Sequence, residues 1–114
     1  MRTTRRSLAL ACASLLLVFG ATSVQAADPE VTIVIKNHRF EPAEVKVKAG
    51  VKVKLVVHNQ DSTPEEFESH SMNREKVIPG GQKATIFIGP LKPGRYTFFG
   101  EYNEKTAHGV VIAE

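Results

Sequence analysis

The sequence has very little cysteine and no tryptophan. Its single cysteine, Cys12, lies within the first 26 residues, and the rest of the chain has none. Residues 27–114 can therefore form neither a disulfide nor a metal site with a thiolate ligand. The length of 114 residues gives room for one domain, which excludes a multidomain enzyme.

The chain also lacks a basic cluster outside its N-terminus. Three of its 15 Lys and Arg residues, Arg2, Arg5 and Arg6, lie in the first 26 residues, which contain no acid. The 12 basic residues that remain balance the 12 acidic residues. Nucleic-acid binding depends on neutralising phosphates with clustered Lys and Arg, so we expect no nucleic-acid partner.

The first 26 residues have the three parts of a secretory signal peptide. A basic start at residues 1–6 precedes an apolar run at residues 7–19 and the small-residue cleavage site Val24-Gln25-Ala26. The alternative is a retained membrane anchor, but the apolar run is shorter than the roughly 20 residues that cross a bilayer. We predict cleavage after Ala26, which removes residues 1–26 and leaves residues 27–114 as a periplasmic domain with no membrane insertion.

The export route stays open between two kinds of signal. Thr4-Arg5-Arg6-Ser7-Leu8 resembles a twin-arginine signal, although paired arginines also occur in general secretory (Sec) signals. Cys12 lies inside the apolar run, whereas the cysteine of a lipoprotein signal follows it. We therefore expect Cys12 to be removed with the signal.

Short stretches of alternating apolar and polar residues predict an all-β domain. Alternation predicts strands at residues 31–36, 44–48, 51–57, 84–88, 95–99 and 108–113. Gly and Pro separate these stretches at near-regular intervals, and no stretch has a helical period over two turns. This pattern indicates an antiparallel β-sandwich or barrel.

Residues 59–83 interrupt the regular succession of alternating stretches. This stretch is mostly polar and is predicted to be a long surface loop with at most one helical turn. Long loops in compact domains are usually functional or disordered. Phe67 indicates that the loop folds back onto the domain.

Four segments, taken in order, resemble cupredoxins, the small copper-binding β-sandwiches of the periplasm. The segments are Phe40-Glu41-Pro42 before Val45-Lys46-Val47-Lys48-Ala49-Gly50, then Asn59-Gln60-Asp61, Pro93-Gly94-Arg95-Tyr96-Thr97-Phe98, and Gly109-Val110-Val111-Ile112. The resemblance implies an all-β, cupredoxin-like Greek-key β-sandwich with a long loop insertion.

The same resemblance implies that the usual copper site is missing. A blue copper site needs two His, one Cys thiolate and usually an axial Met. Here Glu65 and Glu66 stand near the place of the first His, Gly100 in the place of the Cys, and Asn103 in that of the second His. Ala107 or His108 takes the place of the Met. A type-1 copper centre is excluded because residues 27–114 contain no cysteine.

A narrower resemblance rests on residues 61–70, residues 89–94 and Phe99-Gly100-Glu101. These segments are similar to the small periplasmic cupredoxin-like proteins that accompany bacterial ferrous-iron permeases. The resemblance implies a role in iron uptake, as a partner or oxidant of Fe(II) beside the permease.

Carboxylates and imidazoles occur on the two loops that meet at one end of a cupredoxin sandwich. The candidate metal ligands are Glu65, Glu66, Glu68, His70, Glu101 and His108. Such ligands suit Fe(II), Mn(II), Zn(II) or Cu(II), so the expected cofactor is a copper or iron ion. A run of acids is also typical of a solvated surface.

Strand geometry gives these residues expected directions. If Phe67 enters the core, Glu65 points inward with it, and Glu66 and Glu68 share the opposite face. We expect His108 to cap the core, on the same face as Val110 and Ile112. Met72 either adds a soft ligand for Cu(I) or packs against the sandwich.

Two functions follow as hypotheses. The first is a non-enzymatic metal-binding protein of iron acquisition, which binds copper or iron through Glu and His beside an iron permease. A ferroxidase-like role is included in this hypothesis. The alternative is a metal-free docking module that contacts a permease or another periplasmic protein through residues 59–83.

Overall fold

In a computed structural model of the chain, residues 12–20 and 27–114 are described. Residues 12–20 form no regular secondary structure, and the side chains of Leu15, Leu16 and Leu17 are exposed. Residues 1–11 and 21–26, with the predicted cleavage site after Ala26, lie outside the described residues. Within the described ranges, no helix is long and apolar enough to cross a membrane.

Residues 27–114 form an all-β fold, as predicted. Nine strands and one short 3-10 helix follow one another along this described range. They are β1 (Glu30–Lys36), β2 (Arg39–Glu41), β3 (Glu44–Val47), β4 (Val53–Asn59), β5 (Glu65–Ser69), β6 (Arg74–Ile78), β7 (Lys83–Ile88), β8 (Gly94–Gly100), η1 (Glu101–Asn103) and β9 (His108–Ala113).

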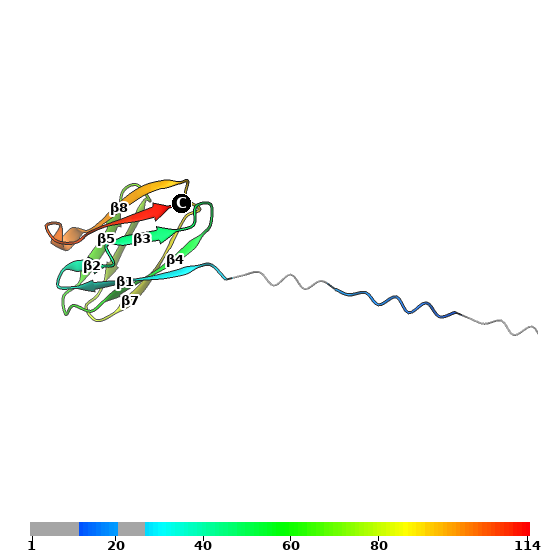
Figure 1. The fold of residues 1–114 in the computed structure, drawn as a ribbon. Coiled ribbons are helices and arrows are strands. Elements are labelled where there is room, and N and C mark those ends of the chain that lie inside the picture. Colours follow the sequence, from blue (N-terminus) through cyan, green and yellow to red (C-terminus); the bar gives the residue numbers. More distant parts are fainter. Residues whose placement is uncertain (1–11, 21–26) are drawn as a thin grey trace, which may run out of the picture.

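The strands form two sheets that pack as a sandwich (Figure 1). One sheet has the order β2-β1-β4-β7, and the other has the order β3-β9-β8-β5-β6. Two pairs, β1 with β4 and β3 with β9, are parallel, so the expectation of a purely antiparallel sandwich was wrong for these pairs. Alternation in a sequence reveals which face a residue occupies but not the direction of the neighbouring strand.

The core is built from the alternating residues that the sequence singles out. Ile33 and Ile35 of β1 and the odd-numbered residues 53–57 of β4 are almost fully buried. Three aromatic rings join the two sheets. The ring centroid of Phe40 in β2 lies 5.0 Å from that of Phe98 in β8 and 6.1 Å from that of Phe67 in β5, and both contacts are edge-to-face. Edge-to-face rings at these distances add to the stabilisation that burial gives. This aromatic cluster fixes the inner face of β5 and β8.

The predicted long loop at residues 59–83 is instead largely a β-hairpin. β5 and β6 pair antiparallel from Glu65 opposite Ile78 to Ser69 opposite Arg74, and β5 also pairs with β8. The inward residues of β5 are Glu65, Phe67 and Ser69, of which only Phe67 is apolar. Because hydrogen bonds satisfy the two polar ones, the strand has no alternating hydrophobic pattern in its sequence.

The Asn59-Gln60-Asp61 segment connects β4 to this hairpin. The buried Asn59 amide donates to the carbonyls of Thr63 (2.8 Å) and Ile78 (3.1 Å), and its oxygen accepts the Asp61 N–H. The Asp61 carboxylate accepts the N–H groups of Asn37 and His38 at 2.8 and 2.9 Å. These contacts tie the start of the hairpin to the turn between β1 and β2.

Candidate metal centre

On strand β5, the side chains of Glu66 and Glu68 point to the outer face of the five-stranded sheet. Their neighbours Glu65, Phe67 and Ser69 face the core, so alternation places these two acids on the opposite side. Glu68 lies opposite Glu75 of β6, and Phe67 lies opposite Gly100 of β8. Glu101, the residue after Gly100, therefore comes next to Glu66.

Four carboxylates meet at this point of the outer face. Glu66, Glu68, Glu75 and Glu101 each offer one carboxylate oxygen, and these oxygens all lie within 4.8 Å of one another. We refer to these residues as the four-glutamate cluster. Glu66 is only 6% exposed, the Glu68 side chain is 15% exposed, and Glu75 and Glu101 are open to solvent. The cluster therefore has a buried floor and an accessible rim.

The buried floor of the cluster lacks hydrogen-bond donors. Within the described residues, Oε1 of Glu66 and Oε2 of Glu68 are buried and accept no hydrogen bond. Buried carboxylate oxygens without a donor are costly, and a cation or a proton satisfies them.

The charge of the cluster is reflected in the pKa of Glu66. A hydrogen bond between the Glu66 and Glu75 carboxyls, which forms when one of them is protonated, raises the pKa of Glu66 most. Burial and Glu101 raise it further, to about 8. Close carboxylates cannot all ionise without a counter-charge, so near neutral pH this cluster retains a proton.

The sequence predicted three members of the cluster and missed Glu75. Glu66, Glu68 and Glu101 were candidate ligands, and the structure brings them together. Glu75 lies in the predicted loop, and its position opposite Glu68 depends on the hairpin register. The turn at Met72-Asn73, where Asn73 has a positive φ of 53°, could have revealed that Glu75 lies opposite Glu68.

Glu65 lies apart from the cluster and points inward with Phe67, as expected. It is 1% exposed. Its Oε1 accepts the N–H groups of Glu66 and Tyr102, both at 3.0 Å, and its Oε2 accepts the Asn103 side-chain amide at 2.6 Å. These hydrogen bonds satisfy the carboxylate within the protein.

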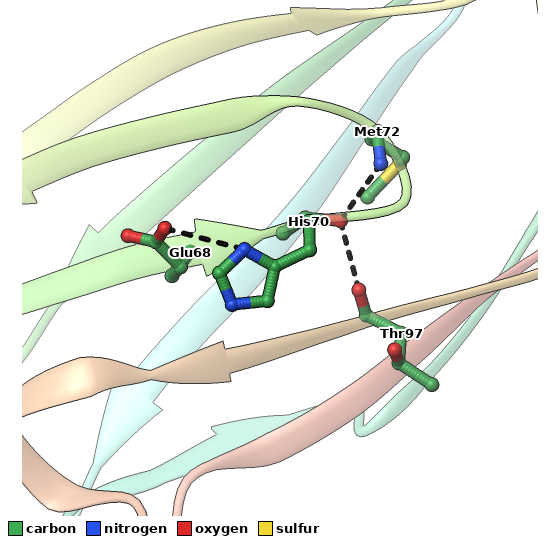
Figure 2. A network of polar contacts seen from close by, with 5 residues as sticks. Glu68, His70, Met72 and Thr97 are labelled. Atoms are coloured by element: carbon green, nitrogen blue, oxygen red, sulfur yellow. Dashed lines mark hydrogen bonds and ion pairs between the residues drawn. The ribbon is translucent and has the colours of Figure 1, made fainter.

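His70 lies beside the cluster rather than within it. Its Nδ1 is 3.8 Å from Oε1 of Glu68 (Figure 2). The centroid of its ring is 5.5 Å from that of the Phe99 ring. The His70 side chain is 81% exposed. Met72 is buried in the core, which confirms packing rather than an outward position for its sulfur.

His108 faces away from the core, which corrects the expected direction of its side chain. The buried residues of β9 are Val111 and Ala113, so His108 shares the opposite face with Val110 and Ile112. His108 is exposed and pairs with Phe99 of β8, outside the four-glutamate cluster. The run Val110-Val111-Ile112 is apolar on both faces, so its sequence does not tell which face is buried.

A family model described as a cupredoxin-like domain matches residues 8–113. The chain belongs to the cupredoxin-like domain family. A curated relative, an uncharacterized protein of Rickettsia prowazekii (strain Madrid E), is 46% identical over 83 residues. The match covers 73% of this chain and 66% of that protein, so the cupredoxin-like chain spans about two thirds of its relative.

Solved structures share the fold of this cupredoxin-like chain. The metal-binding domain of the Cu(I)-exporting P-type ATPase CopA of Streptococcus pneumoniae D39 has a TM-score of 0.67 at 16% identity, covering 75% of this chain and 84% of that one. Auracyanin A, a blue copper protein of Chloroflexus aurantiacus, has a TM-score of 0.68 at 12% identity, covering 77% and 100%. Amicyanin of Paracoccus versutus has a TM-score of 0.57 at 22% identity, covering 80% and 86%.

The residues of this cupredoxin-like domain do not fit blue copper. Residues 27–114 contain no cysteine, and the resemblance to cupredoxins implies that Gly100 stands in the place of the copper-binding Cys. A Cβ atom on Gly100 would lie 2.6 Å from Cδ of Glu65 and 2.7 Å from Cβ of Ala107. The Glu65 carboxyl group therefore fills the space that a ligand at position 100 would need.

Proposed function

We propose that this protein binds a divalent metal ion at the four-glutamate cluster, on the outer face of the sandwich. The observation that carries the proposal is that four carboxylate oxygens lie within 4.8 Å of one another. Two of these glutamates, Glu66 and Glu68, also have a buried oxygen that accepts no hydrogen bond. A cation supplies the counter-charge that this arrangement lacks.

The ligand chemistry favours a hard or borderline cation. Carboxylate oxygens suit Fe(II), Mn(II), Mg(II) and Ca(II), whereas Cu(I) prefers thiolate and thioether ligands. Met72, the methionine of residues 27–114, is buried in the core and offers no soft ligand at the surface. We therefore expect Fe(II) or Mn(II) to bind more tightly than Cu(I), with Cu(II) as a competitor.

The proposed biological role is iron uptake outside the cytoplasm. The N-terminal pattern of a signal peptide supports export, and the resemblance of residues 61–70 and 89–94 to permease-associated proteins supports a place beside a ferrous-iron permease. The cluster holds Fe(II) in this role as a carrier and not as an enzyme. Oxidation of Fe(II) would need a bound copper ion or an external electron acceptor.

Anaerobic calorimetry of the full chain tests metal binding. The metal-free protein is titrated separately with Fe(II), Mn(II), Zn(II), Cu(II) and Cu(I). We expect Fe(II) or Mn(II) to bind at one site, and the double variant E66Q/E101Q to weaken that binding by about 100-fold, because site affinity follows the number of charged ligands. The control variant E41Q/E44Q changes two exposed glutamates away from the cluster and should bind as the wild type does. Unchanged affinity in E66Q/E101Q would overturn the proposal.

A docking module is the second candidate, and exposed apolar side chains beside the cluster favour it. Val77, which pairs with Glu66, is 46% exposed, and Tyr102, which follows Glu101, is 51% exposed. Thermal unfolding separates the two functions. A metal that binds only the folded state raises the melting temperature, so no rise with excess metal supports docking.

A further inference from the structure

Glu65 links strand β5 to the helix η1, the two elements that carry Glu66 and Glu101 of the four-glutamate cluster. One of its oxygens, Oε1, accepts the N–H of Glu66 on β5 and the N–H of Tyr102 in η1, both at 3.0 Å. Glu66 is a member of the cluster, and Tyr102 directly follows another member, Glu101. A single buried oxygen atom thus joins the backbone beside Glu66 to the backbone beside Glu101.

The second oxygen of Glu65 strengthens this link. Oε2 accepts the Asn103 side-chain amide at 2.6 Å, so η1 is bound to Glu65 at two successive residues. Gly100 and Ala107 leave the room that this carboxyl group occupies, as shown by the clash that a Cβ on Gly100 would make. η1 has no side-chain cap at its N-terminus and no buried residue of its own, so these bonds are its main attachment to β5.

We propose that Glu65 is the positioning residue of the four-glutamate cluster: its buried carboxylate fixes the backbone of Glu101 against that of Glu66. The part that Glu65 plays in metal binding rests on the proposed function. Its hydrogen bonds to the N–H groups of Glu66 and Tyr102 are present in the metal-free chain as well. Glu65 itself binds no metal, because its three hydrogen bonds and its inward direction keep it on the other side of β5.

A double-mutant cycle tests this proposal in the full chain. Mn(II) and Fe(II) affinities are measured for E65A in the wild-type background and in the E101Q background. If Glu65 acts by positioning Glu101, E65A weakens binding about tenfold in the wild type and has little effect once Glu101 has lost its charge. An equal loss in both backgrounds, or no loss in either, would overturn the proposal.

Two further variants separate positioning from stability. S69A removes another buried polar group from the same face of β5, where the Ser69 hydroxyl donates to the Thr97 carbonyl (2.8 Å) and accepts the Met72 N–H (Figure 2). S69A should lower stability and keep the metal affinity.

E65Q retains an oxygen for the Glu66 and Tyr102 N–H groups and should preserve the affinity that E65A loses, because the Asn103 amide can turn its oxygen toward the new NH2 group. A loss of affinity in S69A equal to that in E65A would also overturn the proposal.

Crystal structures of metal-free wild type, S69A and E65A keep this test independent of the proposed function. If the wild type binds none of the metals, the proposed function fails. The positioning role then stands only if the carboxylates of Glu101 and Glu66 separate beyond 4.8 Å in E65A and stay together in S69A. An unchanged cluster in E65A would overturn the positioning role.

Discussion

Glu68 of β5 lies directly opposite Glu75 of β6 in an antiparallel pair. Like charges at such a position repel each other and destabilise a sheet. Glu66 and Glu101 add two more carboxylates at the same place. The repulsion at this point of the outer face therefore lowers the free energy of unfolding of the metal-free chain by a measurable amount.

Removing one charge from the cluster should stabilise the metal-free protein. Glu75 is exposed and packs little, so Glu75→Gln relieves repulsion without leaving a cavity. We expect the variant to gain about 0.5 kcal/mol in its free energy of unfolding, measured by urea denaturation with a chelator present. Saturating Mn(II) should reverse the order, since it stabilises the wild type more. Glu41→Gln, at an exposed position of β2, is the control. Lower stability of the Glu75 variant in chelator would contradict the repulsion argument.

The stability of the metal-free protein should fall as the pH rises. The pKa of Glu66 is about 8 in the folded chain against an ordinary value of 4.5, so the folded state holds an extra proton between these values. Its contribution is complete below about pH 4.5 and is lost progressively as the pH rises from there through 8. Urea denaturation of wild type and Glu66→Gln at pH values from below 4.5 to above 8 measures this. A parallel pH dependence in the two proteins would assign the effect to another group.

Metal binding should release the proton that Glu66 holds. At neutral pH a cation must displace it, so affinity should increase from about pH 6 to pH 8. Calorimetry in two buffers with different ionisation enthalpies counts the protons released. We expect about one proton for the wild type and none for Glu66→Gln. Equal release by both proteins would mean that a different group loses the proton.

A cysteine at position 100 should not create a blue copper site. The Cβ of Gly100→Cys would clash with the Glu65 carboxyl group and with Ala107. We expect a loss of about 1–3 kcal/mol in stability, typical of an overpacked core, and no intense blue absorption with Cu(II). Gly100→Ala has the same Cβ without a thiol and should lose similar stability. A stable, blue Gly100→Cys variant would show that the Glu65 carboxyl group gives way easily.

The sequence predicted the parts of the fold in which one face is apolar and the other polar. Alternation at residues 31–36 and 51–57 identified β1, β4 and their inward residues correctly. The inward direction of Glu65 followed from Phe67 by the same rule. Glu66 and Glu68 were found because residues two apart on one strand share a face, and Glu101 because the cupredoxin resemblance placed its loop at the same end of the sandwich.

Two features could not be read from the chain because they depend on contacts distant in sequence. The strand β5 is hidden since hydrogen bonds, not apolar contacts, satisfy Glu65 and Ser69. Glu75 joins the cluster only through the register of the β5–β6 hairpin. Register is set by pairing and turn geometry, which single residues do not encode.

The order of strands β8, β5 and β6 has a consequence for when the protein can hold a cation. Glu66, Glu75 and Glu101 come from three segments that meet only after β5 has been inserted between its two neighbours. An unfolded chain has no such site, so a titration with metal counts correctly folded molecules. A chain that crosses a membrane unfolded would arrive empty, and would take up its ion on the side where it folds.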